Sequence, residues 1–179
     1  MVGDSTIGKT SLMHKFTEGD FDVSYDQTNG VQFIEKTITL RGYKFRFSRP
    51  EFISYVCDDS VAILFMFDLS QISTLYSIKE WYKQTRSFNK NAIYFLIGTK
   101  HDIFKEFEKE TQCDITNKTR HYAIKMKASL IFCSSKHFIN VEEIFKVILS
   151  KHYNLNCKLL EIKEAGYPIL EYKNKQETD

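Results

Sequence analysis

Gly3-Asp-Ser-Thr-Ile-Gly-Lys-Thr10 is the stretch that decides the fold class, because it matches the pattern G-x-x-x-x-G-K-[ST] in full. In such a loop, successive backbone N–H groups converge on phosphate oxygens at the start of a helix, whose dipole adds partial positive charge. The two glycines allow backbone angles that a side chain would forbid. The pattern therefore predicts a loop for a nucleoside phosphate; the plainer alternative is a glycine turn that only caps a helix.

The last residues of this loop bring chemistry of their own. Lys9 would place a formal positive charge on the phosphates, and the hydroxyl of Thr10 would help to coordinate a Mg²⁺ ion that bridges the terminal phosphates. The predicted phosphate-binding residues are Gly3, Asp4, Ser5, Thr6, Ile7, Gly8, Lys9, Thr10 and Ser11.

Length and composition favour one domain and narrow the range of partners. A chain of 179 residues can bury one full core, and a net charge of +2 gives no reason to expect a nucleic-acid partner. The four cysteines show neither C-x-x-C pairs nor zinc-ligand spacing, so we expect reduced thiols and a cytoplasmic location. The longest apolar run, residues 61–67, is far shorter than the roughly 20 residues of a membrane helix, and no C-a-a-X signal ends the chain. We therefore expect no intrinsic membrane anchor.

Apolar periodicity predicts alternating strands and helices. The expected elements are a helix from Lys9 to about Phe16, hairpin strands at 30–40 and 43–48, buried strands at 61–67, 93–97 and 130–133, and helices at 75–88 and after Asn140. Asn140 with Glu143 resembles a capping box for the last helix. This order predicts a doubly wound α/β sheet with helices on both faces and five strands, of which all but the hairpin are parallel. We expect residues 1–157 to form the domain and residues 158–179 an appended tail.

Two polar loops follow buried strands and suggest which base is bound. Thr99-Lys-His-Asp102 comes after the strand that ends at Gly98, and Ser134-Ser-Lys136 comes after the strand that ends at Cys133. In open α/β sheets, ligands bind at such C-terminal strand ends. The Asp102 carboxylate can accept two parallel hydrogen bonds from N1–H and N2–H of guanine, whereas adenine lacks this donor pair. The second motif therefore favours a guanine nucleotide.

With both motifs in place, the chain resembles a small Ras-type GTPase, and specifically the fungal septum-promoting GTPases that trigger septation and mitotic exit. The resemblance covers about residues 1–172. It is carried by Gly3-Asp-Ser-Thr-Ile-Gly-Lys-Thr-Ser-Leu-Met13, Gly30-Val-Gln-Phe-Ile-Glu-Lys-Thr-Ile38, Val61-Ala-Ile-Leu-Phe-Met-Phe-Asp-Leu-Ser70, Ser77-Ile-Lys-Glu-Trp-Tyr82 and Ala128-Ser-Leu-Ile-Phe-Cys-Ser134. Thr99, in place of the usual asparagine of N-K-x-D, is typical of that subfamily.

The resemblance implies a P-loop NTPase fold of the Ras-like type and a set of ligands. GTP or GDP would bind with Mg²⁺, an effector protein kinase and a GTPase-activating regulator would be partners, and the location would be the cytoplasm and the spindle pole body. The implied guanine-binding residues are Phe21, Thr99, Lys100, Asp102, Ser134, Ser135 and Lys136. Thr28 resembles the first-switch threonine that would join Thr10 on the metal.

The sequence departs from the family pattern in two places. The second switch, an Asp-x-x-Gly run followed by glutamine, is absent, because Ser48 passes directly to Arg49 and on to Val61. Only Met1 and Val2 precede the phosphate loop, where the Ras-type fold places its first strand. We therefore name no catalytic residue for hydrolysis. A truncated reading of an intact gene or a protein that has given up hydrolysis would each explain these gaps, and the close match elsewhere favours the former.

Three functions remain open at this point. The first is a guanine-nucleotide switch that recruits a kinase cascade for cytokinesis. The second is a binding module that holds nucleotide, or presents its surface, without hydrolysis, which the missing Asp-x-x-Gly run favours. The third is a small-molecule kinase that uses the same loop. Such a kinase would have no use for the Thr99-Lys-His-Asp102 loop.

Overall fold

Four strands form the central sheet of the structure, a computed structural model that describes residues 1–18, 38–40, 43–45, 57 and 60–172. The order of strands across the sheet is β3-β4-β5-β6. The strands are β3 (Ala62–Asp68), β4 (Ile93–Thr99), β5 (Ser129–Phe132) and β6 (Leu170–Glu171). β3, β4 and β5 run parallel to one another, and β6 pairs with β5 in the antiparallel sense.

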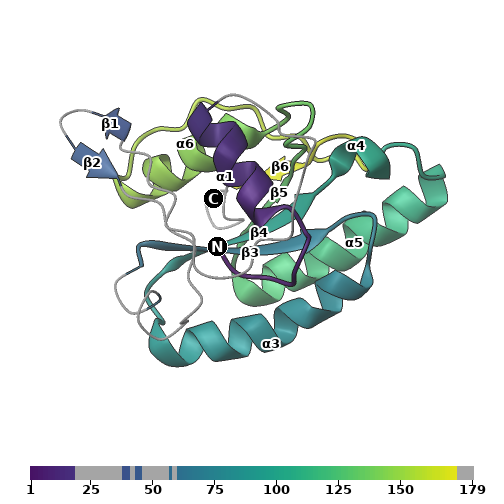
Figure 1. Cartoon of the computed structure of the whole chain (residues 1–179), viewed down its shortest axis with the longest axis horizontal. Helices are drawn as coiled ribbons and strands as arrows, with labels where there is room; N and C mark the ends of the chain where they lie inside the picture. Colours follow the sequence, from purple (N-terminus) through teal and green to yellow (C-terminus); the bar gives the residue numbers. More distant parts are fainter. Residues whose placement is uncertain (19–37, 41–42, 46–56, 58–59, 173–179) are drawn as a thin grey trace, which may run out of the picture.

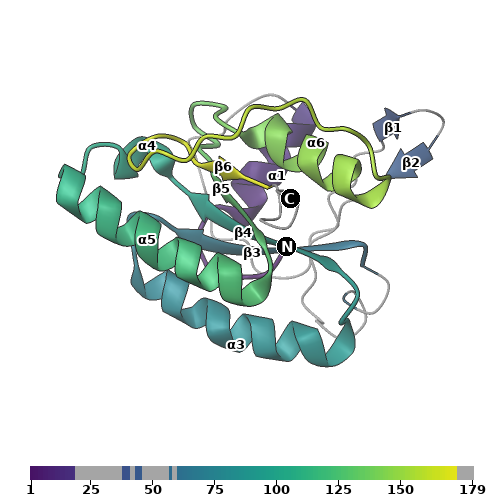
Figure 2. The same cartoon turned by 180° about the vertical axis from the view of Figure 1, so that it is seen from behind.

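Helices cover both faces of this sheet (Figures 1 and 2). One face carries α1 (Lys9–Glu18) and α6 (Val141–His152), and the other carries α3 (Ser73–Phe88) and α5 (Lys109–Met126). The short helix α4 (His101–Phe104) follows β4 directly. This three-layer arrangement confirms the predicted fold class.

The apolar runs form central strands because both of their faces are buried. Every residue of β3 after Ala62 is buried. Since side chains alternate along a strand, Phe65 and Phe67 belong to the core beneath α3 and α5, whereas Leu64 and Met66 belong to the core beneath α1 and α6. The sheet therefore has a separate apolar core on each face.

Val2 occupies the edge of β3 where a first strand was expected. Its N–H donates to the carbonyl oxygen of Leu64 at 2.9 Å, and its carbonyl oxygen accepts from the N–H of Met66 at 2.8 Å. The pairing is an isolated parallel bridge opposite Phe65, and the Val2 side chain is buried. One residue therefore connects the phosphate loop to the sheet on this side.

The predicted five-stranded sheet is wrong in two respects. The hairpin strands β1 (Ile38–Leu40) and β2 (Tyr43–Phe45) pair with each other in the antiparallel sense as expected, but they form a separate two-stranded sheet beyond one end of α6 (Figure 1). In the described part of the chain, neither hairpin strand pairs with β3. The second difference is β6, an antiparallel strand that the apolar pattern did not predict.

β6 belongs to the stretch that follows α6. Within this stretch, Ile162 and Leu170 form an antiparallel bridge, and Leu170 pairs with Ile131 of β5. Ile169 is fully buried. Residues 162–171 therefore pack onto the edge of the sheet, while the domain boundary at residue 157 stays a prediction.

The predicted capping box at Asn140 is also wrong. Asn140 has a left-handed backbone with φ 54° and makes no side-chain cap bond to α6. Its Nδ2 donates instead to the carbonyl oxygens of Phe132 at 2.8 Å and Pro168 at 3.0 Å. The amide is therefore used to connect segments that lie apart in the sequence.

Candidate functional site

The phosphate loop lies between Val2 and α1, and its two glycines meet different surroundings. Gly3 has φ 145°, and a Cβ there would collide with the carbonyl oxygen of Met66 in β3. Gly8 has φ 95°, and a Cβ there would meet no atom within 4 Å. The loop is thus pressed against the sheet at its start and open at its end, where the N-terminus of α1 can receive an anion.

Lys9 places its charge inside this loop. Its Nζ donates to the carbonyl oxygen of Gly3 at 2.8 Å and to that of Asp4, and the side chain is buried. Thr10, in the first turn of α1, is buried as well. The Lys9 ammonium is therefore held within the predicted phosphate loop, and Thr10 lies at the start of the helix that follows it.

Trp81 of α3 contacts the phosphate loop, which the sequence did not predict. Its Nε1 donates to Oδ1 of Asp4 at 2.9 Å. The aromatic stripe of α3 indicated only a core position for Trp81 or Tyr82. Nothing in the local pattern identifies a hydrogen bond to a residue 77 positions away.

The two loops predicted at residues 99–102 and 134–136 lie together at neighbouring strand ends. In the structure the second loop continues to residue 140, and we name residues 99–102 and 134–140 the base loops. Oδ1 of Asp102 accepts from the hydroxyl of Ser134 at 2.6 Å, and the N–H of His101 donates to the carbonyl oxygen of Cys133 at 3.0 Å. A carboxylate has acceptor positions on both oxygens, so Asp102 keeps capacity to accept from a base. Ser134, which is fully buried, fixes the orientation of this carboxylate.

Lys100 is held beside Asp102 by a residue outside the predicted set. It has a left-handed backbone with φ 58°, and its Nζ lies 2.6 Å from Oδ2 of Asp68. The other oxygen of Asp68 accepts from the N–H of Ser70 at 2.8 Å and from its hydroxyl at 2.6 Å. The signal that could have identified Asp68 is an acidic residue directly after a continuous apolar strand.

Thr99 joins the base loops to the phosphate loop. Its hydroxyl donates to the carbonyl oxygen of Ile7 at 2.6 Å and lies 3.0 Å from that of Phe67. The side chain is 3% exposed, so these bonds are protected from water. A hydrogen-bonding side chain at this position therefore couples the two halves of the site.

The remaining predicted residues divide into two groups. Ser135 is half-buried and Lys136 exposed, both in the turn that follows Ser134. Phe21 and Thr28 lie outside the described residues.

Comparison with known proteins agrees with this geometry. A model of the Ras family matches residues 1–154. The chain belongs to the Ras family. It is 55% identical to septum-promoting GTP-binding protein 1 of Schizosaccharomyces pombe, over 96% of this chain and 91% of the relative. It is 27% identical to Ras-related protein RABA2a of Arabidopsis thaliana, over 88% of this chain and 75% of the relative.

The alignment with the S. pombe protein contains gaps. It spans 181 positions, more than the 179 residues of this chain, so this Ras-family chain has gaps opposite residues of the relative.

Burial keeps two titratable groups of the Ras-family site neutral. Burial, with a smaller contribution from the Asp102 carboxylate, raises the pKa of the Cys133 thiol to about 12. Burial lowers the pKa of His101, although hydrogen bonds with the backbone of Gly166 and Tyr167 oppose this shift. Neither side chain is charged at neutral pH, so the charges of the described base loops come from their lysines and carboxylates.

The described residues contain one of the two predicted magnesium ligands, Thr10. Among them, no group of three or more His, Cys, Asp or Glu side chains could enclose a metal. Mg²⁺ at nucleotide sites typically keeps several waters and uses one or two protein ligands beside the phosphates. Thr10 fits such a site, and Thr28 lies outside the described residues.

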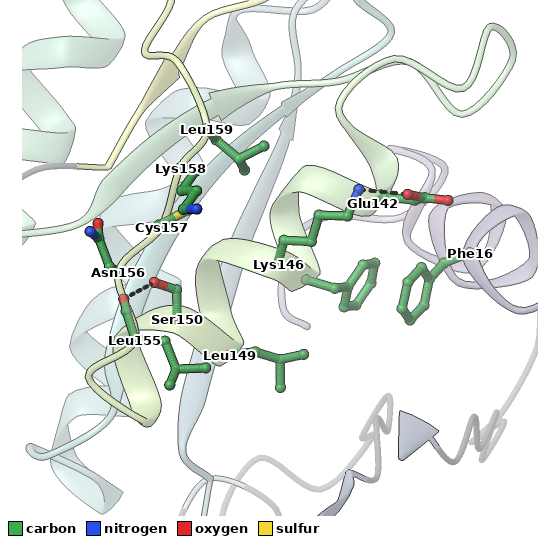
Figure 3. A pocket seen from close by; sticks show the side chains of 11 residues that line it. Phe16, Glu142, Lys146, Leu149, Ser150, Leu155, Asn156, Cys157, Lys158 and Leu159 are labelled. Atoms are coloured by element: carbon green, nitrogen blue, oxygen red, sulfur yellow. Dashed lines mark hydrogen bonds and ion pairs between the residues drawn. The ribbon is translucent and has the colours of Figure 1, made fainter. Parts of the chain in front are cut away.

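A separate cavity of about 530 Å³ lies away from these loops (Figure 3). Its wall is mainly apolar and is formed by α6, residues 155–159 and the ring of Phe16, which stacks on Phe145 with ring centroids 3.5 Å apart. Its lining includes two lysines: Lys146, whose ammonium is paired with Glu142 at 2.7 Å, and Lys158. No helix in the described ranges is long and apolar enough to cross a membrane.

Proposed function

We propose that this chain is a guanine-nucleotide-binding switch of the septum-promoting type, which binds GTP or GDP with Mg²⁺. The observation that carries the proposal is the Asp102 carboxylate, which Ser134 orients at 2.6 Å in a loop that Thr99 ties to the phosphate loop. Two side-chain hydrogen bonds thus support the proposal by connecting the proposed base-reading loop with the proposed phosphate loop.

Each residue has a defined part in the proposed binding. The backbone of the phosphate loop and the Lys9 ammonium would hold the phosphates, while Asp102 would accept from the guanine edge and Lys100 would flank the base. Bound Mg²⁺ would neutralise charge on the terminal phosphates, and Thr10 and Thr28 would be its protein ligands. Phe21, Ser135 and Lys136 would complete the guanine pocket.

The biological role follows from the S. pombe relative, whose name describes it as septum-promoting and GTP-binding. We propose the same role here in septation and cytokinesis, with an effector protein kinase and a GTPase-activating regulator as partners. The proposed location is the cytoplasm and the spindle pole body.

Comparison of GDP with ADP tests the binding proposal. Isothermal titration should give at least tenfold tighter binding of GDP, because two hydrogen bonds to a carboxylate are gained with guanine. Asp102→Asn should weaken GDP binding and leave inorganic pyrophosphate binding unchanged. Ile103→Ala is the matched control, since this neighbouring side chain is 43% exposed. Equal affinities for GDP and ADP would refute the assignment.

A non-hydrolysing binding module is the second candidate, and the missing Asp-x-x-Gly run favours it. A water-positioning residue and a partner's arginine together accelerate GTP hydrolysis by about 10³- to 10⁵-fold. Because this chain lacks the motif that positions water, single-turnover hydrolysis should stay slow with or without a GTPase-activating protein. Rapid turnover that disappears in Lys9→Ala would exclude this candidate.

A further inference from the structure

The segment that follows α6 contacts both base loops. The ring of His101 donates from Nε2 to the carbonyl oxygen of Gly166 at 3.1 Å. At the end of the second base loop, Nδ2 of Asn140 donates to the carbonyl oxygen of Pro168 at 3.0 Å. Figures 1 and 2 both show this segment, drawn in yellow, passing beside α4. We name residues 162–171 the C-terminal clasp.

The clasp fits its place closely at Gly166. This residue has φ 88°, and a Cβ there would collide with Oε1 of Gln112 in α5. Gln112 is itself fixed, because its Nε2 donates to the carbonyl oxygens of Lys105 at 2.9 Å and Phe107 at 3.0 Å. Only glycine satisfies both the backbone angle and the close approach. The position of Gly166, and with it the hydrogen bond to His101, is therefore set by its close packing against Gln112.

The rest of the clasp is anchored to the sheet and to α5. The N–H of Phe132 in β5 donates to the carbonyl oxygen of Ile169 at 2.9 Å, and Ile169 is fully buried. Glu171 pairs with Arg120 of α5 at 2.6 Å. These contacts make the clasp a fixed support against which the base loops rest.

We propose that the C-terminal clasp positions the two base loops and thereby slows the release of guanine nucleotide. His101 stands between Lys100 and Asp102, so a displacement of its ring shifts the residues proposed to flank and read the base. Asn140 is the last residue of the second base loop, which begins at Ser134, and its bond to Pro168 connects this loop to the clasp. The Ras family match ends at residue 154, so the clasp lies outside the part that this chain shares with the family as a whole. The inference rests on the proposed guanine binding.

Gly166→Ala tests the clasp, with Leu160→Ala as control because Leu160 is 86% exposed shortly before the clasp. In stopped-flow displacement of a fluorescent GDP analogue, Gly166→Ala should release nucleotide about two- to tenfold faster, as expected for the loss of one hydrogen bond. Leu160→Ala should behave as the unmodified chain. Inorganic pyrophosphate affinity should not change, since it reports the phosphate loop alone. Unchanged GDP release, or an equal loss of pyrophosphate affinity, would overturn the proposal.

Hydrogen exchange on the unmodified chain tests the same coupling without a variant, and it decides the question if Gly166→Ala does not fold. Because coupling between two sites is reciprocal, GDP should slow exchange of the Ile162 and Leu170 amides, which bond to each other's carbonyl oxygens at 3.1 and 2.9 Å. Pyrophosphate should leave their exchange unchanged. If GDP binds more tightly than ADP but does not slow exchange of these two amides, the proposed role of the clasp is overturned and the proposed guanine binding is not. Equal affinities for GDP and ADP would overturn the proposed function together with it.

Discussion

The phosphate loop and the base loops share both backbone and side-chain contacts, but in different proportions. Gly3 lies against the backbone of β3, and Val2 pairs with the same strand through two backbone hydrogen bonds. The base loops depend more on side chains, as in the bonds of Asp102 with Ser134 and of Lys100 with Asp68. From this comparison we expect added bulk to destabilise the phosphate loop most. Loss of a single polar group should affect the base loops most.

The largest expected effect is on the phosphate side. Gly3→Ala introduces a Cβ that collides with the Met66 carbonyl, so the free energy of unfolding should fall by about 3 kcal/mol or more. Gly8→Ala shares the positive φ but meets no atom, and should cost only about 1 to 2 kcal/mol. Urea denaturation followed by circular dichroism measures both.

Pyrophosphate titration then separates the two glycine variants further. The methyl group of Gly8→Ala lies in the open end of the loop, so this variant should lose pyrophosphate affinity despite its smaller loss of stability. Equal losses of stability in the two variants would contradict the steric account of the phosphate half.

Thr99→Val breaks the bond between the two halves. The substitution keeps the side-chain shape but leaves the buried carbonyl oxygen of Ile7 without this donor, which should cost about 1 to 3 kcal/mol of unfolding free energy. Thr99→Ser keeps the hydroxyl and should lose less. If Val and Ser variants unfold at the same urea concentration, the hydroxyl does not connect the halves energetically.

Acidification should weaken the base half by a smaller amount. Burial lowers the pKa of His101, with Asp102 and Lys105 as the nearby charges, so below about pH 6.5 the unfolded chain binds a proton that the folded chain does not. Stability should therefore fall as pH drops from about 6.5 toward the lower pKa of the folded state. Thermal unfolding at several pH values should show a weaker dependence in His101→Gln, while the exposed His121→Gln serves as control.

The smallest effect is expected at a site outside both halves. Glu142→Gln removes an exposed ion pair with Lys146 on α6 and should cost about 0.3 to 0.5 kcal/mol. The hydrogen bond that Lys146 donates to the Glu142 carboxylate raises the pKa of Lys146, so this contribution is present below about pH 10.5 and is lost at higher pH. GDP affinity, measured by titration, should not change. A loss of GDP affinity in Glu142→Gln would show that residues outside the phosphate loop and the base loops also contribute to binding.

The sequence predicted the features whose signal is local. The phosphate-loop pattern and the apolar runs of β3, β4 and β5 depend on neighbouring residues alone, and periodicity predicted α1, α3 and α6. Helix α5 was not predicted, because its buried face includes polar residues such as Gln112, Thr116 and Thr119 and its mean hydropathy is low.

The contacts that arrange the candidate site depend on residues far apart in the sequence. Asn140 was predicted to cap α6 because only the following residues were considered, whereas its amide bonds to Pro168, 28 positions away. The clasp was predicted to be part of a mixed-charge tail, since the buried Ile169 and Leu170 form too short an apolar run to indicate a strand. Asp68 escaped notice because its ion-pair partner, Lys100, lies after the next strand of the sheet.

The bond between Trp81 and Asp4 also gives the molecule an optical signal of its own. The chain contains one tryptophan, and its indole N–H donates to a carboxylate of the phosphate loop at 2.9 Å. All tryptophan emission therefore originates from one indole at the rim of this loop. Movement of Asp4 as the loop fills or empties should change the intensity or wavelength of that emission, so occupancy can be followed in the unlabelled protein.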